Sequence, residues 1–151
     1  MRSPGRSTKH YRLSSKVFWA ASMILSATAA NAQTNLWLSN QDGFWDIASN
    51  WSVGLPQPTH IVQINFPNIT TTHRLGTTVV DSVTSQAALS ITGGVLQTTN
   101  ASSISRLLLA GGTYTGTGTT TVTQLLTLGG GTMSGAGTTL ANGGCTLTFV
   151  G

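Results

Sequence analysis

The chain has 151 residues, of which only 7% are charged, and its seven basic residues outnumber its three acidic ones. Five of the basic residues lie within the first 16 positions, so the remainder carries two arginines against three aspartates and a net charge of −1. The later sequence therefore lacks the clusters of lysine and arginine with which proteins bind nucleic acids or anionic membranes, and those partners are excluded.

Residues 1–32 have the organisation of a secretory signal peptide. A basic segment precedes the apolar run VFWAASMILSATAA, residues 17–30, and the small residues Ala30 and Ala32 form a cleavage site. The run is shorter than the roughly 20 apolar residues that span a bilayer. We therefore expect cleavage after Ala32 rather than a retained anchor, giving a secreted or cell-surface protein that does not span the membrane once mature.

Residues 33–75 contain all three tryptophans of the mature chain, Trp37, Trp45 and Trp51. We expect this segment to be an N-terminal cap on the repeats that follow, because the first unit of a repeat stack exposes a strand edge and the end of its core. The rival interpretation is an exposed aromatic platform for sugar rings, which would make the same three tryptophans a carbohydrate-binding site.

Residues 76–151 repeat with a period of 18 to 19 residues, which the spacing of Gly76, Gly94, Gly112 and Gly131 marks. A two-residue spacing of apolar side chains within each unit places both on one face of a β-strand. Three apolar columns recur in the units: the pairs Leu89 and Ile91, Leu107 and Leu109, Leu126 and Leu128, Leu147 and Phe149; then Leu96, Tyr114 and Met133; then Ile104, Val122 and Leu140.

This pattern predicts an all-β fold, a parallel β-helix (β-solenoid) of about four coils with the tryptophan-rich cap at its N-terminus. Threonine has high β propensity and suits the outward positions, while stacked coils pair each strand with its counterpart about 4.8 Å away. A disordered Gly/Thr linker predicts no apolar register, and a β-sandwich of hairpins is the other alternative. Because another corner glycine is due near Gly151, we expect residues 76–151 to be part of a longer solenoid, with an open edge that self-associates.

The stretch LTLGGGTMSGAGTTL, residues 126–140, invites several interpretations as a ligand-binding loop. A phosphate-binding loop needs a lysine, which the mature chain lacks. A dinucleotide fingerprint needs glycine where Ser134 lies, and calcium-binding repeats need aspartate, which is absent from residues 82–151. The stretch is therefore predicted to be a corner of the solenoid.

No residue is predicted to be catalytic, to bind a cofactor or to ligate a metal. With glutamate absent from the mature chain, we expect Asp42 to stabilise a turn, Asp46 to cap a single helical turn and Asp81 to be solvated. His60 and His73 have no third ligand nearby, so surface or edge positions are expected for both.

Cys145 is the one cysteine, so no internal disulfide can form even in an oxidising compartment. We expect a buried, unreactive thiol there. The sequence as a whole supports no enzymatic activity and no cofactor.

The string WLSNQDGFWDIASNWSVGLPQPTHIVQINF, residues 37–66, is followed by LSITGGVL, LLLAGGTY and LTLGGGTM. Together they resemble the start of large exported bacterial proteins with autotransporter-associated β-strand repeats, in which a W…W…NWS-x-G-x-P opening precedes β-helical passenger coils. The resemblance covers residues 37–149 and implies a surface-exposed or secreted scaffold or adhesin, with extracellular polysaccharide or surface components as partners. The alternatives are a carbohydrate-binding module or the N-terminal fragment of a polysaccharide-acting β-helix enzyme.

Overall fold

The computed structural model describes residues 31–148. The predicted signal peptide lies outside the described residues except for its last two positions, and so does Phe149. Apart from one short 3₁₀ turn, the regular structure is all β-strand. The elements are β1 Gln33–Leu36, β2 Gly43–Phe44, η1 Ala48–Asn50, β3 His60–Ile64, β4 Thr70–His73, β5 Thr77–Val80, β6 Ser82–Ile91, β7 Val95–Thr98, β8 Ser102–Leu109, β9 Thr113–Gly116, β10 Thr120–Leu128, β11 Thr132–Ser134, β12 Thr139–Ala141 and β13 Cys145–Leu147.

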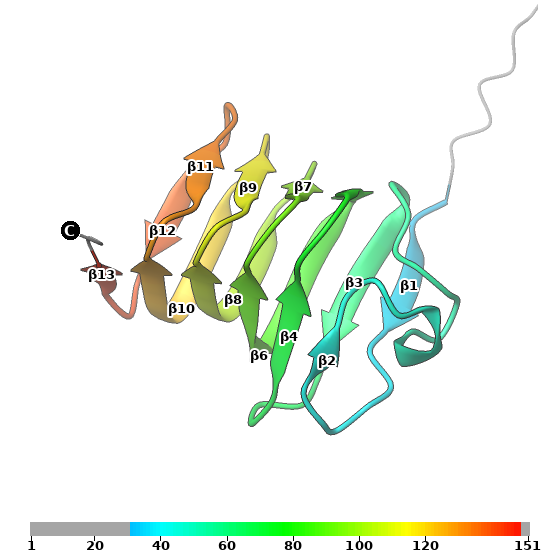
Figure 1. Ribbon diagram of the computed structural model, residues 1–151. Helices are drawn as coiled ribbons and strands as arrows, with labels where there is room; N and C mark the ends of the chain where they lie inside the picture. Colours follow the sequence, from blue (N-terminus) through cyan, green and yellow to red (C-terminus); the bar gives the residue numbers. More distant parts are fainter. Residues whose placement is uncertain (1–30, 149–151) are drawn as a thin grey trace, which may run out of the picture.

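The strands stack in parallel and form three faces of a solenoid (Figure 1). The first face runs β1, β3, β6, β8, β10 and β12, and the third runs β5, β7, β9 and β11. The second face stacks β2 and β4 on the later halves of β6, β8 and β10 and ends at β13. The long strands β6, β8 and β10 bend between the first two faces, where their register shifts. The prediction of a parallel β-solenoid is confirmed.

The stack has about five turns, one more than the sequence pattern indicated. The additional turn consists of β3, β4 and β5, so it begins within residues 33–75, which we assigned to the cap. Its inward positions explain why it escaped the pattern. Thr71 and His73 occupy the columns of Leu89 and Ile91, and both polar side chains are buried.

The predicted apolar columns form the core in the middle of the stack. Leu89 pairs with Leu107 and then Leu126, and Leu96 pairs with Tyr114 and then Met133. Most members of these columns are fully buried, whereas Leu128 and Met133 are only partly buried near the C-terminal end. Coils one strand spacing apart thus share one continuous interior, and burial of that interior stabilises the stack.

The last described coil departs from the prediction in three ways. The unit there is 19 residues long, so Ala141 and not Leu140 continues the Val122 column, and Leu140 is 44% exposed. Leu147 pairs with Leu128 rather than Leu126. Cys145 takes the position next to Leu126 but is exposed, since no further coil covers it among residues 31–148, and the prediction of a buried thiol is wrong.

Glycines form the corners between the second and third faces, as predicted for residues 126–140. Gly76 and Gly94 have φ angles of 72° and 66°, in the left-handed region that glycine adopts without strain. A Cβ on Gly94 would also overlap the carbonyl oxygen of Gly76 on the preceding coil. The glycines of residues 129–131 occupy the equivalent corner between β10 and β11.

Candidate functional site

In the structure the cap is the part of the chain before the first full turn, residues 33–59, and it adds one strand to each of two faces. On the first face β1 pairs with β3, and on the second face β2 pairs with β4. No strand of the cap pairs with β5, which is the edge strand of the third face at the N-terminal end of the stack. The loop of residues 52–59 crosses this side instead, and a cavity lies between it and β5.

The three tryptophans form one buried cluster over the first turn. Trp51 packs edge-on against Trp37 and Trp45, with ring centroids 5.0 Å and 4.8 Å apart, and its Nε1–H donates to the Trp45 carbonyl at 2.9 Å. Each tryptophan is only 2–3% exposed. This burial agrees with the capping role and leaves none of the three rings open as a platform for a sugar.

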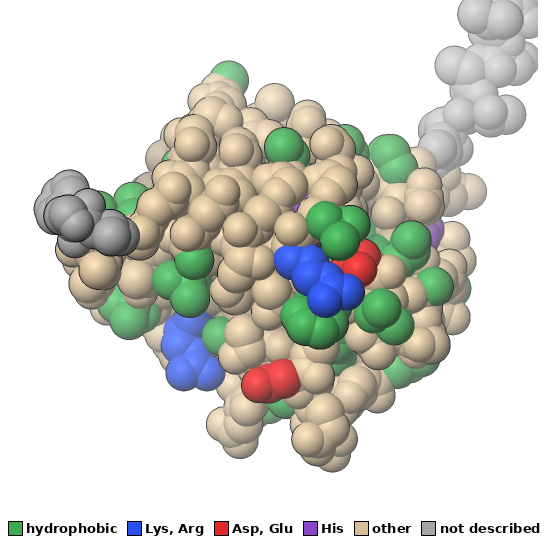
Figure 2. Space-filling view, viewed as in Figure 1, with side chains coloured by type: hydrophobic (Ala, Val, Ile, Leu, Met, Phe, Trp, Pro, Cys, Tyr) green, Lys and Arg blue, Asp and Glu red, His purple; other side chains and the backbone are tan. Residues whose placement is uncertain are grey.

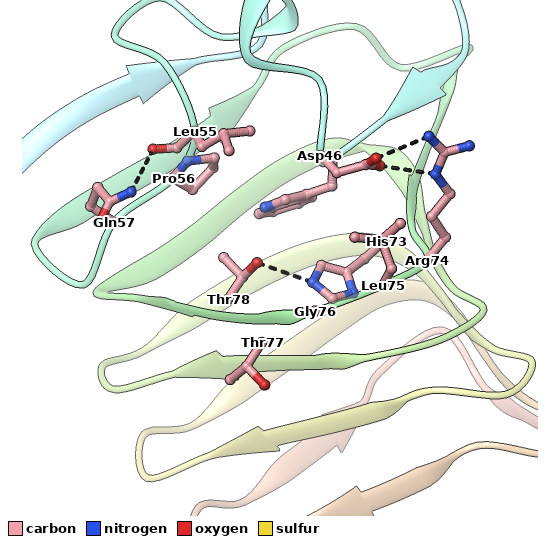
Figure 3. A pocket seen from close by; sticks show the side chains of 11 residues that line it. Asp46, Leu55, Pro56, Gln57, His73, Arg74, Leu75, Gly76, Thr77 and Thr78 are labelled. Carbon is pink, nitrogen blue, oxygen red and sulfur yellow. Dashed lines mark hydrogen bonds and ion pairs between the residues drawn. The ribbon is translucent and has the colours of Figure 1, made fainter.

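The cavity has a volume of about 230 Å³ and is partly open to solvent; Figure 3 shows its lining residues. The cap supplies one wall and the corner between β4 and β5 supplies the other. In Figure 2 a basic and an acidic side chain touch among hydrophobic side chains on this side of the molecule. The lining residues are Trp45, Asp46, Leu55, Pro56, Gln57, His73, Arg74, Leu75, Gly76, Thr77 and Thr78.

Asp46 and Arg74 form a two-pronged ion pair at the cavity. Arg74 Nε and Nη2 donate to the two carboxylate oxygens at 3.0 Å and 2.9 Å, and the guanidinium lies 3.6 Å from the centroid of the Phe44 ring. Hydrogen bonding from Arg74 lowers the pKa of the Asp46 carboxyl and, reciprocally, raises the pKa of Arg74. The helical turn predicted after Asp46 exists as η1, but Ile47 precedes it without a side-chain cap, so the capping role of Asp46 is wrong.

His73 lies beneath this pair and is 1% exposed, which contradicts the expected surface position. Its Nδ1–H donates to the Gly93 carbonyl at 3.0 Å, since a carbonyl can only accept, and Nε2 then accepts from the Thr78 hydroxyl at 3.1 Å. Desolvation lowers the pKa of His73 because burial disfavours the charged imidazolium. Both ring nitrogens are thus occupied by contacts that hold the corner together.

His60 is buried too, at 6% exposed, and the surface expectation is wrong for it as well. Its Nδ1 lies 3.1 Å from both the Gln57 backbone nitrogen and Asn35 Nδ2. The fully buried Asn35 also donates to the Gly54 carbonyl at 2.8 Å. These contacts fix the loop that forms the upper wall of the cavity.

The other two acids make structural contacts. Asp42 Oδ1 accepts from the backbone N–H of Thr70 at 2.7 Å, which ties the cap loop to the start of β4. Asp81 accepts from Asn100 Nδ2 at 2.6 Å and from the Ser82 hydroxyl at 3.1 Å. Within residues 31–148, no three histidine, cysteine or acidic side chains gather as metal ligands would. The same residues contain no helix of the length and apolar character needed to cross a membrane.

Comparison with known proteins gives no match to a family model, a curated protein or a solved structure. The assignment of a site therefore depends on geometry. Sequence reasoning singled out Trp45, Asp46 and His73, which do meet at the cavity, but missed Arg74 and Thr78. Only the β4–β5 corner brings these two residues under the cap, and the spacing of residues along the chain carried no sign of it.

Proposed function

We propose that the protein is an exported β-solenoid that acts as an extracellular scaffold or adhesin, with its outer faces as the contact surface. The observation that carries the proposal is that outward-facing hydroxyl side chains occupy equivalent positions on successive coils. Thr84, Ser103 and Thr121 follow one another in register on the first face. On the third face Thr113 pairs with Thr132 and Thr115 with Ser134. Hydroxyl groups thus recur at the strand spacing of about 4.8 Å over three rungs of the first face and over two rungs of the third face.

Such a surface suits many weak contacts rather than one strong one. A hydroxyl donates and accepts hydrogen bonds, and polysaccharide chains offer matching groups along their length. Repeating a weak contact along a rigid array raises the overall affinity without any single strong site. The apolar interior serves to keep the rows in register, and the resemblance to exported passengers with autotransporter-associated β-strand repeats points to the same role.

The proposal is tested by removing hydroxyls from one face without changing its shape. A third-face variant would carry Thr113→Val, Thr115→Val and Thr132→Val, and a first-face variant Thr84→Val, Ser103→Ala and Thr121→Val. Retention of the purified protein on cellulose, chitin, xylan and fixed cells would be measured, with circular dichroism as the folding control. We expect the parent to be retained on at least one surface and at least one variant to lose that retention. Equal retention of the parent and both folded variants would contradict an adhesive role of the outer faces.

A further inference from the structure

The cavity between cap and solenoid has free backbone groups on its floor. The Val95 N–H on β7 donates to the Gly76 carbonyl at 2.8 Å. The backbone groups of Gly76 therefore point toward β7, away from the cap. In a parallel ladder successive residues point their backbone groups to opposite sides. The N–H and C=O of Thr77 therefore face the cap, and no backbone group among residues 31–148 pairs with them across the cavity. The floor offers one donor and one acceptor in fixed positions.

The walls combine apolar surface with hydrogen-bonding groups (Figure 3). Leu55, Pro56 and Leu75 supply carbon surface, and Leu55 and Leu75 are 43% and 54% exposed. The hydrogen-bonding groups are the Asp46–Arg74 pair and the backbone N–H and C=O of Thr77, whereas the Trp45 indole N–H is buried behind the wall without a hydrogen-bond partner among the described residues. A ligand that fits must therefore present both C–H surface and hydroxyl groups.

The charges at the cavity cancel each other. Asp46 and Arg74 are paired through two hydrogen bonds, and burial favours the neutral form of His73, whose ring nitrogens contact the Gly93 carbonyl and the Thr78 hydroxyl. The carboxylate keeps unused lone pairs and the guanidinium keeps unused N–H groups, so both can still bind a polar ligand. An ionic ligand would leave one member of the pair uncompensated, so the site favours a neutral ligand.

The volume limits the ligand to one small unit. At about 230 Å³ the cavity is smaller than the 300–1,000 Å³ common for drug-sized ligands. A peptide strand pairing along the four residues of β5 would need roughly 13 Å of length, at about 3.3 Å per residue. We propose that the cavity binds one neutral sugar ring, with its C–H face against the apolar wall and its hydroxyls on the backbone groups of Thr77 and on the Asp46–Arg74 pair.

This site is separate from the adhesive outer faces, because Thr113, Thr115 and Thr132 lie outside its walls.

The test is an NMR titration of the isotope-labelled protein with D-glucose, D-galactose, D-mannose and N-acetyl-D-glucosamine in turn, and with their disaccharides. We expect at least one of these sugars to shift the backbone amides of Thr77 and Thr78 and the Trp45 indole N–H. The dissociation constant should be on the order of 1 mM, the range a ligand this small reaches. If the natural ligand is a free monosaccharide, it should cause shifts at least as large as those from its disaccharide. If the ligand is the end of a glycan chain, the disaccharide should cause the larger shifts.

Two matched variants separate this site from general surface effects. Arg74→Gln removes guanidinium N–H groups at the cavity and should weaken binding about fivefold, since one hydrogen bond is lost. Glutamine keeps a polar side chain at this position. Arg106→Gln, at a position outside the walls of the cavity, should leave affinity unchanged.

Four results would overturn the sugar site. These are no shift at the cavity with any neutral sugar, equal affinities of Arg74→Gln and the parent, tighter binding of glucuronate or glucosamine than of the neutral sugars, and shifts at Thr77 from an extended tetrapeptide in place of sugars. The last result would reassign the cavity to strand addition at β5.

Discussion

The Nδ1–H of His73 donates to the carbonyl of Gly93 on the following coil, with an N···O distance of 3.0 Å. His73 occupies the column that continues as Ile91, Leu109 and Leu128, so a polar contact between coils replaces apolar packing at the first turn. The same ring lies beneath Trp45, with ring centroids 6.1 Å apart. A single side chain therefore connects the cap, the corner and the next coil.

This arrangement predicts a pH dependence of stability. Burial lowers the pKa of His73, so between that lowered value and the unfolded value of about 6.5 the unfolded chain binds a proton that the folded chain does not. The free energy of unfolding therefore has its full value above about pH 6.5. It decreases as the pH falls below this value, by up to about 1.4 kcal/mol per pH unit. Urea unfolding of the parent and of His73→Leu at several pH values measures this contribution. Leucine fits the column, and the variant should show a smaller slope; equal slopes would mean that His73 does not contribute.

The alternation along β8 predicts opposite outcomes at two neighbouring leucines. Leu109 is fully buried, and Leu109→Asp should cost about 4 kcal/mol or more because an unpaired carboxylate would enter the core. Leu108 is 38% exposed on the same strand, and Leu108→Asp should cost less than about 1 kcal/mol. Denaturant unfolding measures both. Similar costs at the two positions would favour a disordered linker over the solenoid.

Two corner glycines separate backbone strain from the contact between coils. Gly76 and Gly94 both have positive φ, so alanine at either position should cost about 1–2 kcal/mol. A Cβ at position 76 meets nothing within 4 Å, whereas at position 94 it overlaps the carbonyl oxygen of Gly76. Gly94→Ala should therefore be the more destabilising change in thermal unfolding. If Gly76→Ala were as harmful, the coils would not approach each other as closely as described.

Disrupting the buried tryptophan cluster should destabilise the protein strongly. Trp51→Ala should cost about 3–5 kcal/mol because it removes the central ring and its hydrogen bond to the Trp45 carbonyl. Leu38→Ala, at a position 56% exposed, is the matched control and should change stability by no more than about 0.5 kcal/mol. If Trp51→Ala had the same free energy of unfolding as the parent, the tryptophan cluster would not be what stabilises the N-terminal end of the stack.

The last described coil offers a surface for self-association. Leu140 and Leu147 are 44% and 57% exposed, and β11, β12 and β13 have a strand partner on one side only among residues 31–148. Exposed strand edges pair readily, and lysine at an edge opposes this pairing. Sedimentation velocity should show association of the parent and a shift toward monomer in the double variant Thr146→Lys and Thr148→Lys. A parent that stays monomeric at high concentration would contradict this expectation.

The periodic part of the fold could be predicted from the sequence because one apolar column repeats in successive coils. The prediction missed the first turn, where polar residues take inward positions. Thr71, His73 and Ser85 lie in columns that hold leucine or isoleucine one coil later, so the pattern missed the first turn and placed both histidines on the surface. The two histidines are stabilised by partners far away in the sequence, the Gly93 carbonyl for His73 and Asn35 for His60, which no local pattern reveals.

The cavity could not be predicted for a related reason. It exists because the cap supplies rungs to two faces and none to the third, which depends on how the loop of residues 52–59 crosses the end of the stack. The pairing of Asp46 with Arg74 likewise joins residues 28 positions apart across the corner. Sequence spacing indicates neither.

Export to the cell exterior is the central claim, and one labelling experiment tests it most directly. An epitope inserted between Asn40 and Gln41, in the exposed loop between β1 and β2, should leave the fold intact. Cells producing the full chain would be labelled with antibody before and after permeabilisation, and the N-terminus of the labelled protein would be determined by mass spectrometry. We predict labelling of intact cells, or recovery from the medium, with Gln33 as the first residue. Labelling only after permeabilisation, on a chain that still begins at Met1, would contradict the assignment of the protein as an extracellular scaffold.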